Sequence, residues 1–358
     1  MTRREGKHSW RARIRHRVRQ FQLWLRVVIV ALRVRAVRHR QPVDRRSGVG
    51  VGVIVRDGGP FVDVFLRHYL ALGVDRITVL DNGSRDDTIQ RALDFGTRVE
   101  VLKCGLAFPR WETAMKSYLV RRAGTGRRWA LLVDIDEMFD FPGSDVVSLA
   151  ELVAHLKSLG VSGMVAHLLD VFPPILDPKD NCFDPAAHDR FELDHVVSAN
   201  YTDFATQHEV QVDTSNAAGM VFQLNGFRHH LLGFERPLWI TKHALLHPCA
   251  GVWLSHPHLV QGAILAPTSA ILVHHSLTGS TVAKARVAVA ERRYGWSAQD
   301  EYSRYASKLE GDCPIRLAGP RTLRYHGPDQ LLALGFLQVG RSLSEVIAER
   351  RNASAGTQ

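Results

Sequence analysis

Between residues 49 and 171 the chain alternates short apolar runs with segments whose apolar residues recur every three or four positions. The apolar runs predict five strands, at 49–58, 76–80, 98–102, 128–136 and 162–171. The segments between them predict four helices, at 60–73, within 81–96, at 110–124 and at 148–160. Strands that alternate with helices over such short connections pair in parallel. The pattern therefore predicts an α/β fold, with a mainly parallel sheet flanked by helices.

Acidic residues mark the ends of several predicted strands. Asp57, Asp81, Asp134 and Asp136 all lie at a predicted carboxyl end. Ligands of parallel sheets bind beyond these ends, so we expect the side chains to converge on one crevice. No GxGxxG or GxxxxGKS/T sequence opens a predicted helix, so the glycines of a dinucleotide site or a P-loop are missing.

The stretch "ALLVDIDEMFDF", residues 130–141, brings Asp134, Asp136 and Glu137 out of an apolar run. A carboxylate buried without a partner costs several kcal/mol, so a cation is expected beside this group. Mg²⁺ and Mn²⁺ prefer one or two carboxylates together with phosphate oxygens. The stretch therefore predicts a Mn²⁺ or Mg²⁺ cofactor that neutralises a diphosphate leaving group.

The rest of the chain is less regular. Residues 173–218 are polar and weakly periodic, which indicates long loops or a substrate-specific insertion. Further strands are predicted at 219–224, 226–232 and 269–277, and further helices at 281–293, 299–309 and 329–350. We expect a basic arm at 1–46, one α/β domain at 47–310 and a C-terminal helical extension at 311–358.

The arm holds most of the positive charge. Residues 1–46 contain fifteen Lys or Arg against two acids, whereas the other 312 residues have a net charge of −3. A helical projection places six apolar residues on one stripe beside a stripe of arginines: Trp10, Ile14, Phe21, Leu25, Val28 and Leu32. The apolar run between Arg26 and Arg33 is only six residues long, against about 20 for a membrane span. The arm therefore predicts an amphipathic helix that lies on an anionic membrane surface through residues 8–36.

Two other interpretations of the arm stay open, a solvated tail and non-specific nucleic-acid binding, although no nucleic-acid partner is expected. The four scattered cysteines form no CxxC pair, and no signal peptide is recognised. We expect a cytoplasmic protein, peripheral on the inner face of the plasma membrane.

Two stretches resemble a known family. "VRDGGPFVDVFLRHYLALGVDRITVLDNGSRDDT" followed by "WALLVDIDEMFDFP" is similar to the bacterial glycosyltransferase family 2 group with a "DIDEF" sequence, over about residues 49–172. The later "ITKHALLHP", "SHPHLVQGA" and "ILVHHSL" resemble it more loosely. The resemblance implies a GT-A fold and a nucleotide-sugar donor. It also implies that the domain has a donor half at about 47–172 and an acceptor half at about 173–310.

The resemblance also implies roles for single residues. Donor contacts are expected at Arg56, Asp57, Asp81 and Asp134, and metal contacts at Asp134, Asp136 and His274. Asp57-Gly58 departs from the Asn-Glu that relatives often have after the first strand.

An inverting transferase needs a base that deprotonates the acceptor hydroxyl. Asp170, at the end of the predicted fifth strand, is one candidate. Glu235 is the other, because it lies at about the distance downstream of the DxD where such bases often occur. His256 and His258 are candidates for lining the acceptor cleft.

The function expected from the resemblance is transfer of a sugar from a nucleotide-diphosphate sugar to an acceptor hydroxyl. The reaction is expected to be inverting and metal-dependent, with a glycan or glycolipid acceptor, in bacterial surface glycan or glycolipid synthesis. One alternative is a catalytically degenerate GT-A domain that serves as a membrane-bound scaffold. Another is a DxD phosphatase, but that class has its DxD on the first strand, whereas three strand–helix units precede it here.

Overall fold

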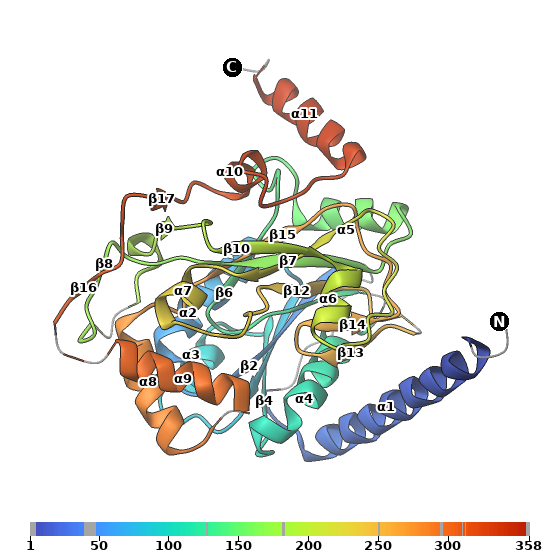
Figure 1. Cartoon of the computed structure of the whole chain (residues 1–358). Coiled ribbons are helices and arrows are strands. Elements are labelled where there is room, and N and C mark those ends of the chain that lie inside the picture. Colours follow the sequence, from blue (N-terminus) through green and yellow to red (C-terminus); the bar gives the residue numbers. More distant parts are fainter. Residues whose placement is uncertain are drawn as a thin grey trace.

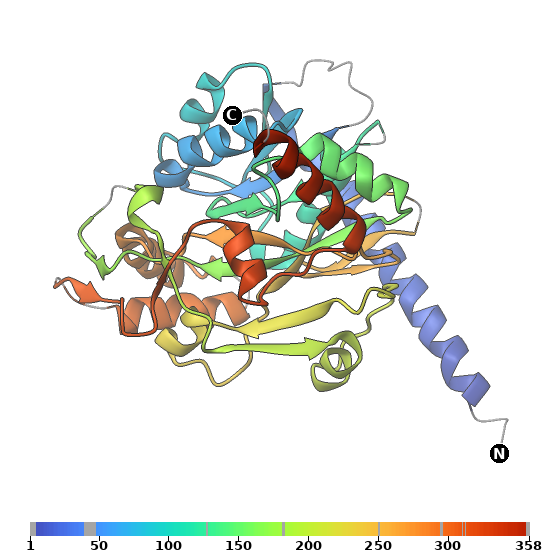
Figure 2. The same ribbon diagram turned by 90° about the horizontal axis from the view of Figure 1, so that it is seen from above.

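The computed structural model describes residues 5–38, 48–126, 128–180, 183–249, 251–293, 296–309, 311 and 313–355. Its centre is a nine-stranded sheet with helices on both faces (Figure 1, Figure 2). The strands follow one another across the sheet in the order β1 (Arg35–Arg38), β4 (Val99–Lys103), β3 (Arg76–Asp81), β2 (Val49–Val55), β5 (Trp129–Leu132), β12 (Thr241–Leu246), β7 (Gly163–Asp170), β15 (Ala270–His274) and β6 (Glu137–Asp140).

The predicted α/β architecture is confirmed. β4, β3, β2 and β5 are parallel neighbours, and β15 is parallel to β7. The sheet is mixed, because β1, β12 and β6 pair antiparallel with their neighbours. β12 lies between β5 and β7, so a strand from the second half of the chain completes the edge where the acidic strand ends meet.

The helices are α1 (Glu5–Arg33), α2 (Gly59–Ala71), α3 (Thr88–Asp94), α4 (Phe108–Ala123), α5 (Leu149–Ser158), α6 (Tyr201–Gln207), α7 (Phe227–Leu232), α8 (Gly279–Ala290), α9 (Trp296–Lys308), α10 (Pro328–Ala333) and α11 (Arg341–Ala355). α4 and α1 pack on one face of the sheet. α2, α3, α5, α10 and α11 pack into the core on the other face. The C-terminal segment thus contributes Leu331, Phe336 and Leu343 to the main core.

Small two-stranded sheets surround the large one. They pair β10 (Val196–Asn200) with β11 (Val221–Asn225), β13 (Trp253–His256) with β14 (Leu259–Gln261), β8 (Ile175–Leu176) with β16 (Ile315–Arg316), and β9 (Arg190–Phe191) with β17 (Leu323–Arg324). The segment 173–218, expected as loops or an insertion, therefore contains short strands and the helix α6 besides its loops.

Three predicted elements of the domain and the C-terminal segment differ from the structure. The strand predicted at 226–232 is wrong: this segment is the helix α7, enclosed by Gly226 and Gly233, which both have positive φ. The helix predicted at 329–350 is two helices, separated by Gly335 at φ +74°. The strand predicted at 128–136 ends at Leu132, so the DxD lies in a turn before β6.

The arm also differs in its last part. Its helix ends at Arg33, and β1 then joins the edge of the large sheet beside β4. Within the described part of the chain, no helix combines the length and apolarity that a membrane crossing requires.

The glycines of β2 set how closely α4 approaches the sheet. A Cβ atom on Gly50 would lie 2.4 Å from the carbonyl oxygen of Ala123 in α4, closer than atoms can pack. We expect Gly50→Ala to lower the free energy of unfolding by about 1–3 kcal/mol, because the helix must shift away from the strand. Gly105→Ala is the control, since nothing lies within 4 Å of its added Cβ. Urea denaturation would compare the two variants, and equal stability would contradict the expected close packing.

Candidate active site

A cavity of about 720 Å³ lies beyond the carboxyl ends of β2 and β5. Its walls come from the end of β2, the β5–β6 turn, α4, β12, the β13–β14 hairpin and the helices α8 and α9. Charged and histidine side chains are concentrated in it, including Lys116, Asp134, Asp136, Lys242 and His274. The volume is in the range of sites for small molecules and cofactors.

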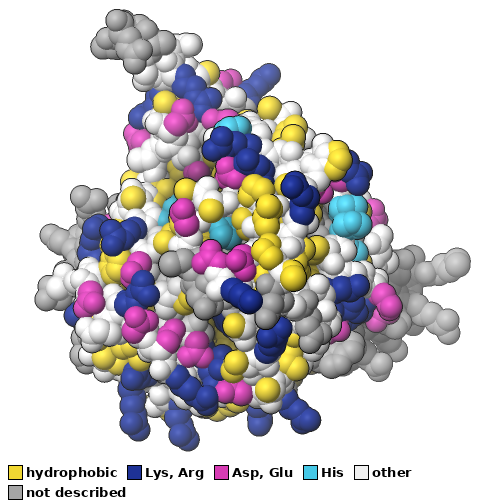
Figure 3. Space-filling view, turned by 90° about the vertical axis from the view of Figure 1, so that its left-hand side faces the viewer, with side chains coloured by type: hydrophobic (Ala, Val, Ile, Leu, Met, Phe, Trp, Pro, Cys, Tyr) yellow, Lys and Arg dark blue, Asp and Glu magenta, His cyan; other side chains and the backbone are white. Residues whose placement is uncertain are grey.

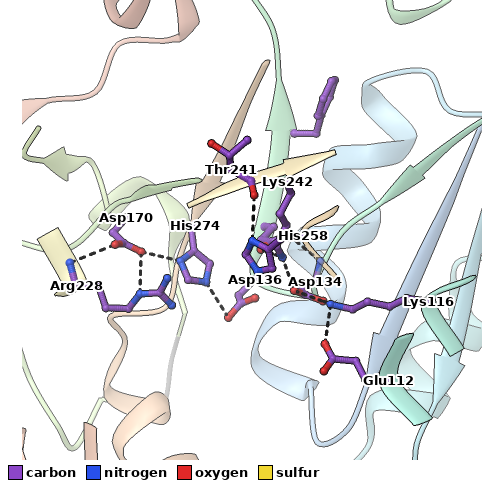
Figure 4. A network of polar contacts seen from close by, with 12 residues as sticks. Glu112, Lys116, Asp134, Asp136, Asp170, Arg228, Thr241, Lys242, His258 and His274 are labelled. Atoms are coloured by element: carbon purple, nitrogen blue, oxygen red, sulfur yellow. Dashed lines mark hydrogen bonds and ion pairs between the residues drawn. The ribbon is translucent and has the colours of Figure 1, made fainter. Parts of the chain in front are cut away.

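Two lysines hold the first carboxylate of the DxD. The Nζ of Lys242, on β12, lies 2.5 Å from Oδ2 of Asp134, and the Nζ of Lys116, on α4, lies 3.1 Å from Oδ1 (Figure 4). Lys242 also pairs with Glu137, and Lys116 with Glu112 at 3.1 Å. Burial by itself raises the pKa of Asp134, but the two ammonium groups outweigh it and hold the pKa well below its ordinary value.

The cation that compensates Asp134 is therefore a pair of lysines. Both carboxylate oxygens of Asp134 are paired with ammonium groups, whereas the resemblance implies that this residue contacts a donor and a metal; those two contacts stay predictions. The two lysines reach it from α4 and from β12, which are far apart in the sequence.

The second carboxylate has a different partner. Oδ2 of Asp136 lies 3.7 Å from Nε2 of His274, at the end of β15. The Nδ1 of the same histidine is hydrogen-bonded to Oδ1 of Asp170 at 2.7 Å. Asp170 is held in turn by Arg228, through its backbone N–H at 3.3 Å and its Nε at 3.5 Å. Figure 4 shows these four residues as one continuous chain of contacts.

This chain orients the histidine. Because Asp170 accepts the hydrogen from Nδ1, Nε2 of His274 is the nitrogen that faces Asp136. Burial and the charge of Arg228 act to lower the pKa of His274, but the hydrogen bond to Asp170 and the two carboxylates raise it overall. A carboxylate behind a histidine is the arrangement that commonly orients a metal-binding imidazole.

The side chains of Asp136 and His274 fit a hard divalent cation that has two protein ligands. Among the described residues, no three His, Cys, Asp or Glu side chains converge to form a closed metal cage. Asp136 and His274 face each other at the cavity, and Mg²⁺ or Mn²⁺ usually takes few protein ligands together with phosphate oxygens and water. These two residues could thus hold such an ion.

The other predicted donor-binding residues differ in whether they line the cavity. Arg56 lines the cavity and pairs with Glu291 at 2.9 Å, while Asp57, at φ +53°, pairs with Arg293 at 2.8 Å. The buried Asp81 lies outside the cavity lining, and its carboxylate accepts the backbone N–H groups of the turn at 83–84.

Neither predicted base lines the cavity. Asp170 is buried behind His274, with both oxygens engaged. Glu235 is exposed and lies outside the cavity lining.

Sequence reasoning missed Lys116 and Arg228. Lys116 interrupts the buried face of α4 between Met115 and Leu119, and a lysine at a core position was the one available signal. Arg228 lies in the helix that was predicted as a strand, so its direction could not be foreseen.

Comparisons with known proteins give distant likenesses. No protein-family model matches the chain, and a search of curated proteins finds no match. The solved structure of S. aureus TarS 1–349 in complex with UDP is 15% identical with a TM-score of 0.26, covering 34% of this chain and 35% of that one. A second structure of TarS 1–349 is 9% identical with a TM-score of 0.32, covering 72% and 70%.

A third likeness is to glucosyl-3-phosphoglycerate synthase from Mycobacterium tuberculosis in complex with Mn²⁺, UDP and glucosyl-3-phosphoglycerate. It is 15% identical with a TM-score of 0.23, covering 37% of this chain and 50% of that one. The chain spans about a third of the length of the first of these structures.

Proposed function

We propose that this protein is a glycosyltransferase that moves a sugar from a nucleoside-diphosphate sugar to an acceptor hydroxyl, with inversion and with a divalent metal. The observation that carries the proposal is the pair Asp136 and His274, 3.7 Å apart, oriented by Asp170 and facing a cavity of about 720 Å³ at the strand ends. A glycan or glycolipid of the bacterial surface is the proposed acceptor class.

Asp136 and His274 would hold the Mn²⁺ or Mg²⁺ ion, which when bound neutralises charge on the diphosphate leaving group. Lys284 lines the cavity and would supply further positive charge to the diphosphate. Lys116 and Lys242 are buried at the same wall, where Glu112, Asp134 and Glu137 compensate their charge. Fixed charges in a water-poor site stabilise a developing diphosphate more strongly than the same charges in water.

Calorimetry tests the proposal with UDP, GDP and TDP as probes, each with and without Mn²⁺. We expect one of them to bind the whole chain, and Mn²⁺ to strengthen its binding. His274→Ala should weaken that Mn²⁺-dependent binding by about 10–100-fold, because one of two protein ligands is lost. The measurement is the ratio of dissociation constants with and without Mn²⁺.

His275→Ala is the matched control. His275 is the next residue along the chain, but its ring packs against Phe183 and His188 instead of lining the cavity. This variant should lose stability and keep its response to Mn²⁺. Equal losses of metal response in both variants would remove His274 from the metal site.

The scaffold alternative makes a separate prediction about turnover. A degenerate domain would bind a nucleoside diphosphate and cleave no nucleotide sugar, whereas a transferase releases nucleoside diphosphate from its donor. Turnover with a panel of nucleotide sugars therefore separates the two functions.

We also propose that α1 rests on an anionic membrane surface, on the cytoplasmic side of the plasma membrane. Five members of the predicted apolar stripe have exposed side chains, led by Leu32 at 79% and Phe21 at 57% exposure. The helix docks on α4 through a different side, where Val27 and Val30 are buried. The exposed side is therefore not needed for the fold, and exposed apolar side chains that share one side of a helix favour an interaction.

Charge complementarity supports a lipid partner. Nine arginines and one lysine lie between residues 5 and 38, against the single acid Glu5. By contrast, basic, acidic and hydrophobic side chains are interspersed over the face of the molecule in Figure 3. In Figure 1 and Figure 2, α1 projects beyond the body of the protein, so its outer side can reach a flat surface.

A further inference from the structure

The proposed transfer needs a group that accepts the proton of the attacking hydroxyl, and the carboxylates of the cavity are already engaged. Each carboxylate that lines it within the described chain has a cationic or histidine partner. These residues are Glu112, Asp134, Asp136, Glu137 and Glu301.

Four histidines of the described chain line the same cavity. His274 faces Asp136, and the Nε2 of His208 is buried without a hydrogen-bond partner. The other two, His256 and His258, lie where β13 turns into β14. The histidines of this hairpin are therefore the candidates for the base.

The hydrogen bonds of the hairpin determine both tautomers. Nδ1 of His258 lies 3.1 Å from the backbone carbonyl of Thr241, which can only accept, so Nδ1 carries the hydrogen. The neutral ring then has an unprotonated Nε2, and no hydrogen bond to this atom is formed within the described chain. His256 is the reverse: its Nδ1 accepts the backbone N–H of His258 at 3.1 Å, so its Nε2 carries the hydrogen.

β12 holds His258 in place from two sides. His258 donates to the carbonyl of Thr241, and the Nδ1 of His243 donates to the carbonyl of His258 at 2.9 Å. Lys242, between these two residues of β12, is the lysine that pairs with Asp134. The strand β12 thus positions both His258 and the lysine that pairs with the DxD, as Figure 4 shows for Thr241, Lys242 and His258.

We propose that His258 is the general base of the transfer and that His256 hydrogen-bonds a neighbouring oxygen of the acceptor. This inference rests on the proposed function. The acceptor oxygen forms a bond to the anomeric carbon while its proton passes to Nε2 of His258. The bond from that carbon to the diphosphate breaks, its electron pair leaves with the diphosphate, and the imidazolium releases its proton to water.

The environment suits this role. Burial first, and the nearby ammonium group of Lys242 next, lower the pKa of His258 well below its ordinary value, so Nε2 is unprotonated at neutral pH. A weak base suffices, because the attacked carbon carries positive charge in an oxocarbenium-like transition state, and the hydroxyl becomes more acidic as it attacks.

His258→Asn tests the inference on the whole chain. The amide NH₂ of asparagine can still donate to the carbonyl of Thr241, but no atom replaces the basic Nε2. His258→Gln is the second variant, with an amide group near the Nε2 position that cannot take up a proton. His326→Asn is the control, since this histidine is exposed and lies outside the cavity lining.

Two measurements are made with Mn²⁺ present. The first is calorimetric binding of UDP, GDP and TDP. The second is cleavage of the glucose and galactose derivatives of these nucleoside diphosphates, with water as the acceptor. We expect His258→Asn and His258→Gln to bind the nucleoside diphosphate within about twofold of the unchanged chain, and to cleave the donor about 10²–10⁴-fold more slowly. The control should match the unchanged chain in both.

The outcomes separate this inference from the proposed function. Cleavage at the unchanged rate by either variant that still binds the nucleoside diphosphate would overturn the role of His258. An unchanged chain that binds the nucleoside diphosphate and cleaves no donor would overturn the base and favour the scaffold. A chain that binds none of the three probes would overturn the proposed function itself, and the inference with it.

Discussion

Asp136→Asn should abolish the effect of Mn²⁺ on nucleoside-diphosphate binding, with a loss on the order of 100-fold in affinity when the metal is present. The physical reason is the small number of protein ligands. Asp136 and His274 are the two side chains that we propose hold the ion, and an amide oxygen has no charge with which to attract it. Binding without metal should change little, because Lys116 and Lys242 keep their own partners.

The fold should tolerate this change. Asparagine has nearly the shape of aspartate, and the Asp136 side chain is 24% exposed at the cavity. The measurement is calorimetry of UDP, GDP and TDP at fixed excess Mn²⁺, together with a thermal unfolding curve of each variant.

Asp140→Asn is the control for the first prediction. It makes the same conservative change four residues along the same stretch, at a carboxylate outside the cavity lining that accepts the N–H of Phe141 at 2.8 Å. The control should keep its full response to Mn²⁺. The metal site is wrongly assigned if Asp136→Asn responds to Mn²⁺ as strongly as Asp140→Asn does.

Replacing Phe21, Leu25 and Leu32 together with aspartate should remove the protein from vesicles that contain anionic lipid. Each of these side chains contributes about 1.5–3 kcal/mol when it is buried in an apolar phase, and each new carboxylate is repelled by the lipid surface. Their exposure, from 42% to 79%, means that the fold does not depend on them. We expect the apparent affinity for the vesicles, measured by co-sedimentation, to fall at least about 100-fold.

The matched control carries the same three changes elsewhere. Ile264, Val287 and Leu334 are exposed by 45–48%, and none of them lies on α1. Their replacement by aspartate should leave vesicle binding nearly unchanged. Equal binding by both triple variants would show that α1 is not the membrane contact.

Salt distinguishes the three interpretations of the arm. A helix that buries apolar side chains should retain part of its vesicle binding at moderate salt. A solvated basic tail should lose it, and nucleic-acid binding should show a steep linear dependence of log affinity on log salt.

Local features of the fold could be predicted from the sequence, because their causes lie within a few residues. The capping box at Ser148 is one: its hydroxyl accepts the N–H of Glu151 at 3.3 Å, and the Glu151 carboxylate accepts the N–H of Ser148 at 2.9 Å. The β-branched run of β2 and the apolar spacing of α2 likewise appear where the pattern placed them. Side-chain periodicity of 2 or 3.6 residues was sufficient for these elements.

The secondary structure of the segment 226–232 could not be predicted from periodicity. A short apolar run is compatible with either a strand or a helix, and the contacts of the whole fold decide between them. Here the glycines at both ends take positive φ and enclose a short helix, which carries Arg228 to Asp170.

The sequence by itself determined that Asp134 and Asp136 would lie at the carboxyl edge of an α/β sheet, although Asp57 and Asp81, expected in the same crevice, lie outside the cavity lining. It did not determine the partners of Asp134 and Asp136. Lys242 lies 108 positions after Asp134 and reaches it because β12 enters the sheet between β5 and β7. The same insertion holds His258 beside the cavity. Strand order is set by packing across the whole sheet, and no short-range pattern contains it. Only the tertiary structure therefore decided that Asp134 meets lysines while Asp136 faces a histidine.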